Sequence, residues 1–403
     1  MNAETLYRGL AAIFLMVALT LPYVGGSATA YVTIVLILLL SGWNFVVTRR
    51  VHLDTGSIML LGAFVALLLV FAIHNRPGTT DVLYGFNFVL FALYGPFATA
   101  LNRLAKPGNS TTVGTLALCG AGLAFVVALV QVFVFHYLRA EGWYSNPIPS
   151  ATVAVLLGFL ALVGYRSSVG WRQTLLLLGP VIGIGTVYLA GSRGPLLAVP
   201  FLILIALFMA QLSRRAILLI GLLLVVEIGS FAVLLPDNLQ RFVAIGEAAN
   251  EYAAGEDVGA DLSFSIRLKI YESSFRAFLD SPLIGHGWAM KVPAAAKYVD
   301  GIYPDSHQTH LHSDIFNFAV SAGIVGLLAY LAVLLAPLAS LRATPRDSQY
   351  EARRYGVAVL VAGYAACGTI NLLFGFEYMS TFYIATAATL IGYCRDAPIA
   401  AAA

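Results

Sequence analysis

The sequence predicts an all-α, polytopic membrane protein with about twelve transmembrane helices. Three observations predict it: the composition, the long apolar segments and the distribution of positive charge. Of the 403 residues, 60% are hydrophobic and only 11% are charged, whereas soluble domains carry about 25% charged residues. The mean hydropathy is +0.85. Most of the chain is therefore expected to lie in lipid.

Twelve segments approach the roughly 20 apolar residues that a transmembrane helix requires. The predicted spans are residues 10–22, 30–47, 56–73, 82–102, 113–136, 149–165, 173–190, 195–212, 216–235, 312–341, 356–374 and 380–394. Away from the span ends, Glu227 is the single acidic residue, and no span contains Lys or Arg. Ion-coupled transporters carry ionisable groups at mid-membrane, so the sequence argues against a transporter. A polar neighbour inside the bundle also explains Glu227.

Positive charge indicates which side of the membrane each segment faces. With the N-terminus inside, every inside loop carries at least two basic residues, whereas the short outside loops carry only Arg76, Arg139 and Arg193. Both termini are therefore expected in the cytoplasm. Arg8, the apolar run after it and ATA at 28–30 also resemble a signal peptide. Removal of such a peptide would leave the other helices in the same orientation.

One long polar loop on the outside divides the chain. We expect spans one to nine over residues 1–235, the outside loop over 236–308, and spans ten to twelve with a cytoplasmic tail over 309–403. The loop is predicted to contain two amphipathic helices, Leu239–Ala253 and Asp261–Asp280. An aspartate suits the N-cap of the second helix, and a turn rich in Pro and Gly follows that helix.

Several kinds of chemistry have no signature in this sequence. It contains no G-x-x-x-x-G-K-[ST] loop for nucleotide phosphates and no H-E-x-x-H zinc motif. The cysteines, Cys119, Cys367 and Cys394, all lie in predicted spans, so no disulfide framework is expected. Any reaction is therefore expected to take place on the outside face.

The second loop helix carries one arginine without a local acidic partner. Arg276 belongs to a ladder of charges at i+3 and i+4 spacing, which is typical of a solvated face. Arg267 lies on the opposite face, which also carries Tyr271, Ser274 and Phe278. An arginine on such a face requires an anion from elsewhere. That anion is either a structural carboxylate or a ligand phosphate.

Two further outside arginines lie in short loops between spans. Arg193 is part of the turn GSRG at 191–194, and Pro195 suits the first turn of the next helix. An arginine beside the N–H groups of a helix N-terminus favours phosphate. An arginine that snorkels to lipid headgroups fits the same position. Arg139, near the interfacial Trp143, is a secondary candidate.

The densest polar stretch is PDSHQTHLHSD, residues 304–314, directly before span ten. A helix beginning near His307 would place His307, His310 and Asp314 on one face and turn His312 away. A non-helical segment would instead allow His310 and His312 to chelate a metal. Two other interpretations are a histidine at the membrane rim and a general base, because a neutral imidazole accepts a proton from a hydroxyl.

Four short motifs, in order along the chain, resemble those of the O-antigen ligase and polymerase superfamily. HSDIF at 312–316 and GIVG at 323–326 are similar to the family's His-Asn/Ser-x-x-Leu and Gly-Ile-x-Gly motif, with Phe in place of Leu. The upstream matches are GSRG at 191–194, SIR at 265–267 with Tyr271, and PLIGHG at 282–287. Twelve spans with one large loop before the histidine helix also resemble the family's layout.

The resemblance implies a GT-C-type glycosyltransferase that acts in the periplasm without a metal or another cofactor. Its donor would be a glycan on undecaprenyl diphosphate and its acceptor a hydroxyl of the lipid A–core. Its surroundings would be the lipids of a Gram-negative inner membrane, with no nucleic acid involved. The motifs assign catalysis to His312 and diphosphate binding to Arg193 and Arg267. The secondary candidates are Arg139, Tyr271, Ser313 and His310.

Other functions predict different observations. A polymerase that extends lipid-linked glycan and a protein O-oligosaccharyltransferase share this chemistry and differ only in the acceptor. A flippase would need a polar path through the spans, which the sequence offers only at Glu227. A metal-dependent enzyme would lose activity in a chelator. The overall resemblance favours the ligase.

Overall fold

The computed structural model describes residues 2–75, 80–143, 146–254, 262–299 and 309–399. These residues form helices and no β-strand. The α-helices are α1 (Ala3–Thr20), α2 (Pro22–Thr48), α3 (Thr55–Ile73), α4 (Asp81–Gly85), α5 (Val89–Asn102), α6 (Asn109–Leu129), α7 (Pro147–Leu160), α8 (Trp171–Leu176), α9 (Leu178–Leu189), α10 (Arg193–Met209), α11 (Arg214–Leu234), α12 (Pro236–Ala254), α13 (Leu262–Asp280), α14 (Lys291–Ala296), α15 (Asp314–Arg342), α16 (Tyr350–Gly368) and α17 (Glu377–Ala388). Short 3₁₀ or π turns join or extend them, namely η1 (Phe86–Phe88), η2 (Val130–Val134), η3 (Ala161–Gly164) and η4 (Thr389–Tyr393).

The prediction of a multi-pass, all-helical membrane protein is confirmed. In the described ranges, nine helical segments are long and apolar enough to cross a membrane. The other three predicted spans lie on α10, α16 and α17 with η4. Helix α10 is shorter, at 17 residues, and α16 carries Glu351, Arg353 and Arg354 in its first turns. The count of twelve therefore stays a prediction.

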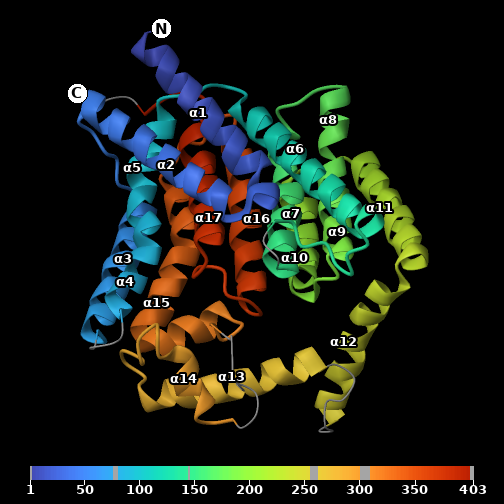
Figure 1. Cartoon of the computed structure of the whole chain (residues 1–403). Helices are drawn as coiled ribbons and strands as arrows, with labels where there is room; N and C mark the ends of the chain where they lie inside the picture. The colour runs from blue at the N-terminus through green and yellow to red at the C-terminus, as the bar shows by residue number, and fades with distance from the viewer. Residues whose placement is uncertain (1, 76–79, 144–145, 255–261, 300–308, 400–403) are drawn as a thin grey trace.

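Both ends of the described chain lie at the same end of the bundle (Figure 1). The backbone N–H of Ile399 donates to Asn102 at 2.7 Å, and Arg103, the next residue, pairs with Glu4 at 3.0 Å. Helices α12, α13 and α14 lie at the opposite end, called the distal end below. A chain whose two ends lie on one side crosses the membrane an even number of times.

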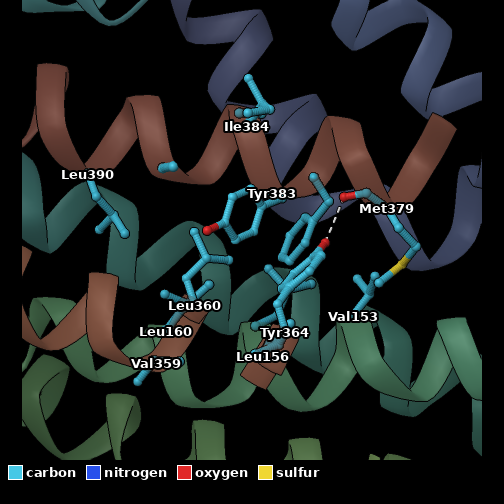
Figure 2. Close-up of a cluster of buried hydrophobic side chains, with 14 of the residues drawn as sticks. Val153, Leu156, Leu160, Val359, Leu360, Tyr364, Met379, Tyr383, Ile384 and Leu390 are labelled. Carbon is cyan, nitrogen blue, oxygen red and sulfur yellow. Dashed lines mark hydrogen bonds between the residues drawn. The ribbon is translucent and has the colours of Figure 1, made fainter. Parts of the chain in front are cut away.

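The helices differ in how much surface they bury, and this difference separates the centre from the rim. From Pro149 to Leu160 every residue of α7 is buried, as expected of a helix that is apolar all round and central. Beside α7, the hydroxyl of Tyr364 on α16 donates to the carbonyl of Met379 on α17 at 2.7 Å (Figure 2). By contrast, most of α11 is exposed toward lipid, although Glu227 turns inward onto α9.

Both predicted loop helices are present at the distal end. Helix α12 runs slightly longer than predicted, and α13 begins at Leu262, directly after the predicted N-cap Asp261, which lies outside the described residues. The Arg276–Glu272 pair of the predicted charge ladder is formed at 2.7 Å on the exposed face of α13.

The motif PLIGHG at 282–287 is inserted into a break in α15. The break is at Gly323, whose φ of 61° and ψ of −144° interrupt the helix. It leaves the carbonyls of Val320 and Ser321 to accept the N–H groups of His286 (2.8 Å) and Gly287 (2.9 Å). The N–H of Ile324 donates to Pro282 at 2.8 Å. These backbone bonds fix the end of α13 on α15.

We expect Gly323→Ala to destabilise the whole protein. A Cβ at this position would lie 2.4 Å from the backbone carbon of Leu283, and the left-handed φ penalises any side chain. The expected cost is at least about 1–3 kcal/mol. It is measured as a lowered thermal midpoint of the protein in detergent. The matched control is Gly229→Ala, where a Cβ meets no atom within 4 Å. Equal thermal midpoints for Gly323→Ala and Gly229→Ala would contradict the inference that the helix break at Gly323 stabilises the protein.

Candidate active site

The face of α13 that carries Arg267 is turned toward α15, as the helical spacing predicts. Tyr271 and Phe278 are half-buried and Ser274 is completely buried, whereas Arg276 on the other face is exposed. Burial lowers the pKa of Arg267 below its usual value, and the neighbouring Tyr271 opposes this shift. In the described part of the chain no carboxylate forms an ion pair with Arg267. Within the described ranges, the guanidinium thus lacks the structural carboxylate that one interpretation required.

Tyr271 ties α13 to the segments before α15 and after α16. Its hydroxyl lies 3.0 Å from the carbonyl oxygen of His312 and 3.1 Å from that of Thr369. Its ring stacks on Phe316 with centroids 5.0 Å apart. Burial raises the pKa of this phenol to about 12, so the hydroxyl remains a hydrogen-bond donor at neutral pH. Tyr271 therefore positions the backbone that carries His312.

The two described histidines of the polar stretch lie in a non-helical segment. Of the two alternatives, the structure excludes a helix that runs from near His307 into span ten, because residues 309–313 are non-helical and α15 begins at Asp314. His307 itself lies outside the described residues. The N–H of Asp314 donates to Asn371 at 3.1 Å, and its carboxylate accepts the N–H of Leu373 at 2.8 Å. Tertiary contacts to the segment after α16 therefore fix where α15 begins.

His310 and His312 contact each other directly. The backbone N–H of His312 donates to Nδ1 of His310 at 3.1 Å, and the ring centroids are 4.4 Å apart. Because this Nδ1 accepts, a neutral His310 carries its proton on Nε2. His312 has a φ of +50°, in the left-handed region that residues other than glycine seldom adopt. Such strained residues cluster at functional sites.

The imidazole of His312 is neutral and has an open nitrogen. Burial, followed by the positive charge of Arg267, lowers the pKa of His312 to about 4. Its Nδ1 is buried and has no hydrogen-bond partner among the described residues. Burial and the neighbouring positive groups lower the pKa of His310 to about 3. A neutral ring nitrogen without a protein partner has the free lone pair that a general base requires.

The residues that the structure describes do not assemble into a group that holds a metal. Among the described residues, no three His, Cys, Asp or Glu side chains converge. The segment is non-helical, as chelation by His310 and His312 would require, but Nδ1 of His310 is already bonded to the backbone of His312. Metal independence stays a prediction.

Arg193 lies at the first position of α10, in a turn that Arg139 holds in place. Nε of Arg139 donates to the carbonyl of Ala190 at 2.9 Å, and its Nη2 lies 3.2 Å from the Ser192 hydroxyl. Arg139 therefore positions the turn that carries Arg193. A Cβ on Gly194 would lie 2.6 Å from the Ile370 side chain, so this turn adjoins the segment after α16.

The segment at 369–376 thus connects all parts of the candidate site. It contacts the GSRG turn through Ile370, the α13 tyrosine through Thr369, and the start of α15 through Asn371 and Leu373. The hydroxyl of Ser313, a secondary candidate, is buried and lies 3.4 Å from the carbonyl of Gly368. Ser313 is therefore part of the same framework.

Sequence reasoning missed Lys291, the first residue of α14. The side chain is only 4% exposed. Its ammonium donates to the carbonyl of Trp288 at 3.0 Å and lies 4.0 Å above the ring of that tryptophan. Burial lowers the pKa of Lys291 to about 7. The one available signal was the apolar residues around Lys291 in WAMKVPAAA at 288–296.

A comparison with protein families matches part of the chain. The family model for O-antigen ligase matches residues 178–331, from the start of α9 into α15. No curated protein matches the chain. The matched stretch contains every site residue predicted from the sequence except Arg139, and over these residues the chain is similar to the O-antigen ligase family.

Proposed function

We propose that this protein is an O-antigen ligase of the GT-C type. It would transfer a glycan from undecaprenyl diphosphate to a hydroxyl of the lipid A–core. The distal end would face the periplasm of a Gram-negative bacterium, with both termini in the cytoplasm and the bundle in the inner membrane. The observation that carries the proposal is the neutral His312, whose buried Nδ1 has no hydrogen-bond partner among the described residues and whose pKa is lowered by the charge of Arg267.

Arg267 and Arg193 are the proposed diphosphate ligands. A half-buried guanidinium that no described carboxylate pairs is costly unless an anion reaches it. The donor's diphosphate supplies that anion, and Arg193 at the N-terminus of α10 adds a second contact together with the helix N–H groups. Both arginines would offset the charge that grows on the diphosphate as it leaves.

His312 is the proposed general base. The acceptor oxygen attacks the anomeric carbon while the bond from that carbon to the phosphate oxygen breaks. Undecaprenyl diphosphate leaves with the bonding electrons, and the hydroxyl proton passes to Nδ1 of His312. Since Arg267 lowers the pKa of His312, a bound diphosphate that offsets this charge makes the imidazole a stronger base. The donor would therefore activate the base that deprotonates the acceptor.

A product assay tests the proposal. The purified protein in nanodiscs receives lipid-linked glycan, lipid A–core and EDTA, and the products are separated on a gel. We expect glycan on the lipid A–core despite the chelator, with an inverted linkage by NMR. Longer carrier-linked glycan alone would mean a polymerase, and transfer to added protein alone would mean an oligosaccharyltransferase. Loss of transfer in EDTA, restored by a divalent ion, would refute the metal-independent mechanism.

A further inference from the structure

A cavity of about 490 Å³ lies beside the two histidines. Its walls come from α4 and η1, from α14 with the turn before it, from Thr309, and from residues 372–376. Thr309 directly precedes His310, and the ring of Phe376, another wall residue, meets the His310 ring edge-on at 5.6 Å. The cavity therefore adjoins the candidate active site.

The side chains that line this cavity suit a sugar with an anionic substituent. Tyr84 and Phe376 offer aromatic surfaces on which the C–H face of a sugar ring packs. The amide of Asn87 and the hydroxyl of Thr309 offer hydrogen bonds to sugar hydroxyls. A pocket with aromatic walls and a few polar groups is typical of small-molecule sites.

Lys291 gives the cavity an amino group that keeps N–H donors without a hydrogen-bond partner among the described residues. Of its three N–H donors, one is used by the neutral carbonyl of Trp288. The acidic group whose charge acts on it is Asp81. One carboxylate oxygen of Asp81 accepts the N–H of Ala289 at 2.8 Å. A buried ammonium with donors to spare is a binding point for phosphate or carboxylate.

The position of the cavity favours the acceptor over the donor. None of the described residues that line it belongs to α10 or α13, the helices that carry Arg193 and Arg267. The charges of both Arg267 and Lys291 act on His310, so the histidine pair lies within reach of both groups. The proposed diphosphate site and the cavity are therefore lined by different elements, and both lie next to the histidine pair.

We propose that this cavity binds the acceptor glycan and that Lys291 contacts a phosphate or carboxylate on it. The assignment rests on the proposed ligase function. It makes Lys291 a binding residue that selects anionic acceptors, with no part in the proton transfer.

The test measures binding of purified lipid A–core to the full-length protein in nanodiscs without donor. We expect Lys291→Met to raise the Kd about tenfold or more, as for loss of a charge-assisted hydrogen bond. Asn87→Leu, on the exposed wall of the cavity, should also weaken binding and serves if the buried substitution fails to fold. The matched control is Lys297→Met, an exposed lysine at the end of α14, which should bind as wild type does.

Kinetics separate this inference from the ligase proposal. With Lys291→Met, the KM for acceptor should rise while the KM for donor stays within twofold of wild type. A change in the donor KM alone, or altered binding of phosphatidylglycerol instead of lipid A–core, would overturn the acceptor assignment. The acceptor assignment would also be overturned if Lys291→Met and Asn87→Leu both bound lipid A–core and turned over as the wild-type protein does. If the binding of lipid A–core depended on Lys291 but the wild-type protein transferred no glycan to lipid A–core, the ligase function would be refuted instead.

Discussion

Replacing His312 with asparagine is expected to lower kcat by about 10²–10⁴-fold, the usual contribution of a general base. Asparagine is the most informative substitution because it tolerates the left-handed φ of this position. It also retains a hydrogen-bond acceptor while losing the ability to take a proton. Donor binding and the thermal midpoint should stay near wild type. The measurement is single-turnover transfer to lipid A–core.

His52→Ala is the matched control, since His52 is exposed and lies on the segment between α2 and α3. It should retain wild-type activity. Full activity in His312→Asn would mean that His312 only orients the acceptor. A loss of activity accompanied by a loss of folded protein would assign His312 a structural role.

The pH profile of wild type follows from the same imidazole. Because the pKa of His312 is lowered to about 4, the free enzyme holds a neutral base at neutral pH. It loses that base only as the pH falls through this value. The acid limb of kcat/KM, which reports the free enzyme, should therefore lie near this pH. The acid limb of kcat, which reports the enzyme with substrate bound, should lie at higher pH, because the bound diphosphate offsets the charge of Arg267 and raises the pKa of His312. If the acid limbs of kcat/KM and kcat fell at the same pH, the bound donor would not raise the pKa of His312, and activation of the base by the donor would be contradicted.

Replacing Arg267 with glutamine is expected to lower kcat/KM for the donor by about 10²–10³-fold, as for removal of one group that stabilises the leaving charge. The substitution should also move the acid limb of kcat/KM to higher pH. The sign follows from the structure: the positive charge of Arg267 lowers the pKa of His312, so its removal raises that pKa. The measurement is initial rate against donor concentration across pH.

Arg276→Gln is the control within the same helix. Arg276 is exposed and pairs with Glu272, and such surface pairs contribute about 0–1 kcal/mol. Activity and the acid limb should stay as in wild type. An equal loss of activity in Arg267→Gln and Arg276→Gln would mean that only the net positive charge of α13 matters. If the acid limb of Arg267→Gln stayed where it is in wild type, Arg267 would have no effect on the pKa of His312.

The sequence by itself determined the class of the protein, and it predicts the chemistry of the candidate site. Long apolar runs and sparse charge are properties of contiguous residues, so they predict membrane helices without any knowledge of packing. The helical spacing also separated the buried face of α13 from the exposed face of Arg276 correctly. The motif residues from 191 to 326 all fall inside the matched family region, residues 178–331.

The tertiary structure alone decided how these residues meet. The non-helical backbone at His312, the start of α15 at Asp314 and the insertion of PLIGHG at Gly323 all depend on hydrogen bonds to distant segments. Local periodicity contains no trace of such bonds. The burial of Lys291 is of the same kind, since Trp288 and its aromatic neighbours on α3, η1 and α15 enclose that region. The physical reason is that the spacing of apolar residues along the sequence determines which face of a helix is buried. Which segment packs against that face depends on contacts between residues that are remote in the sequence.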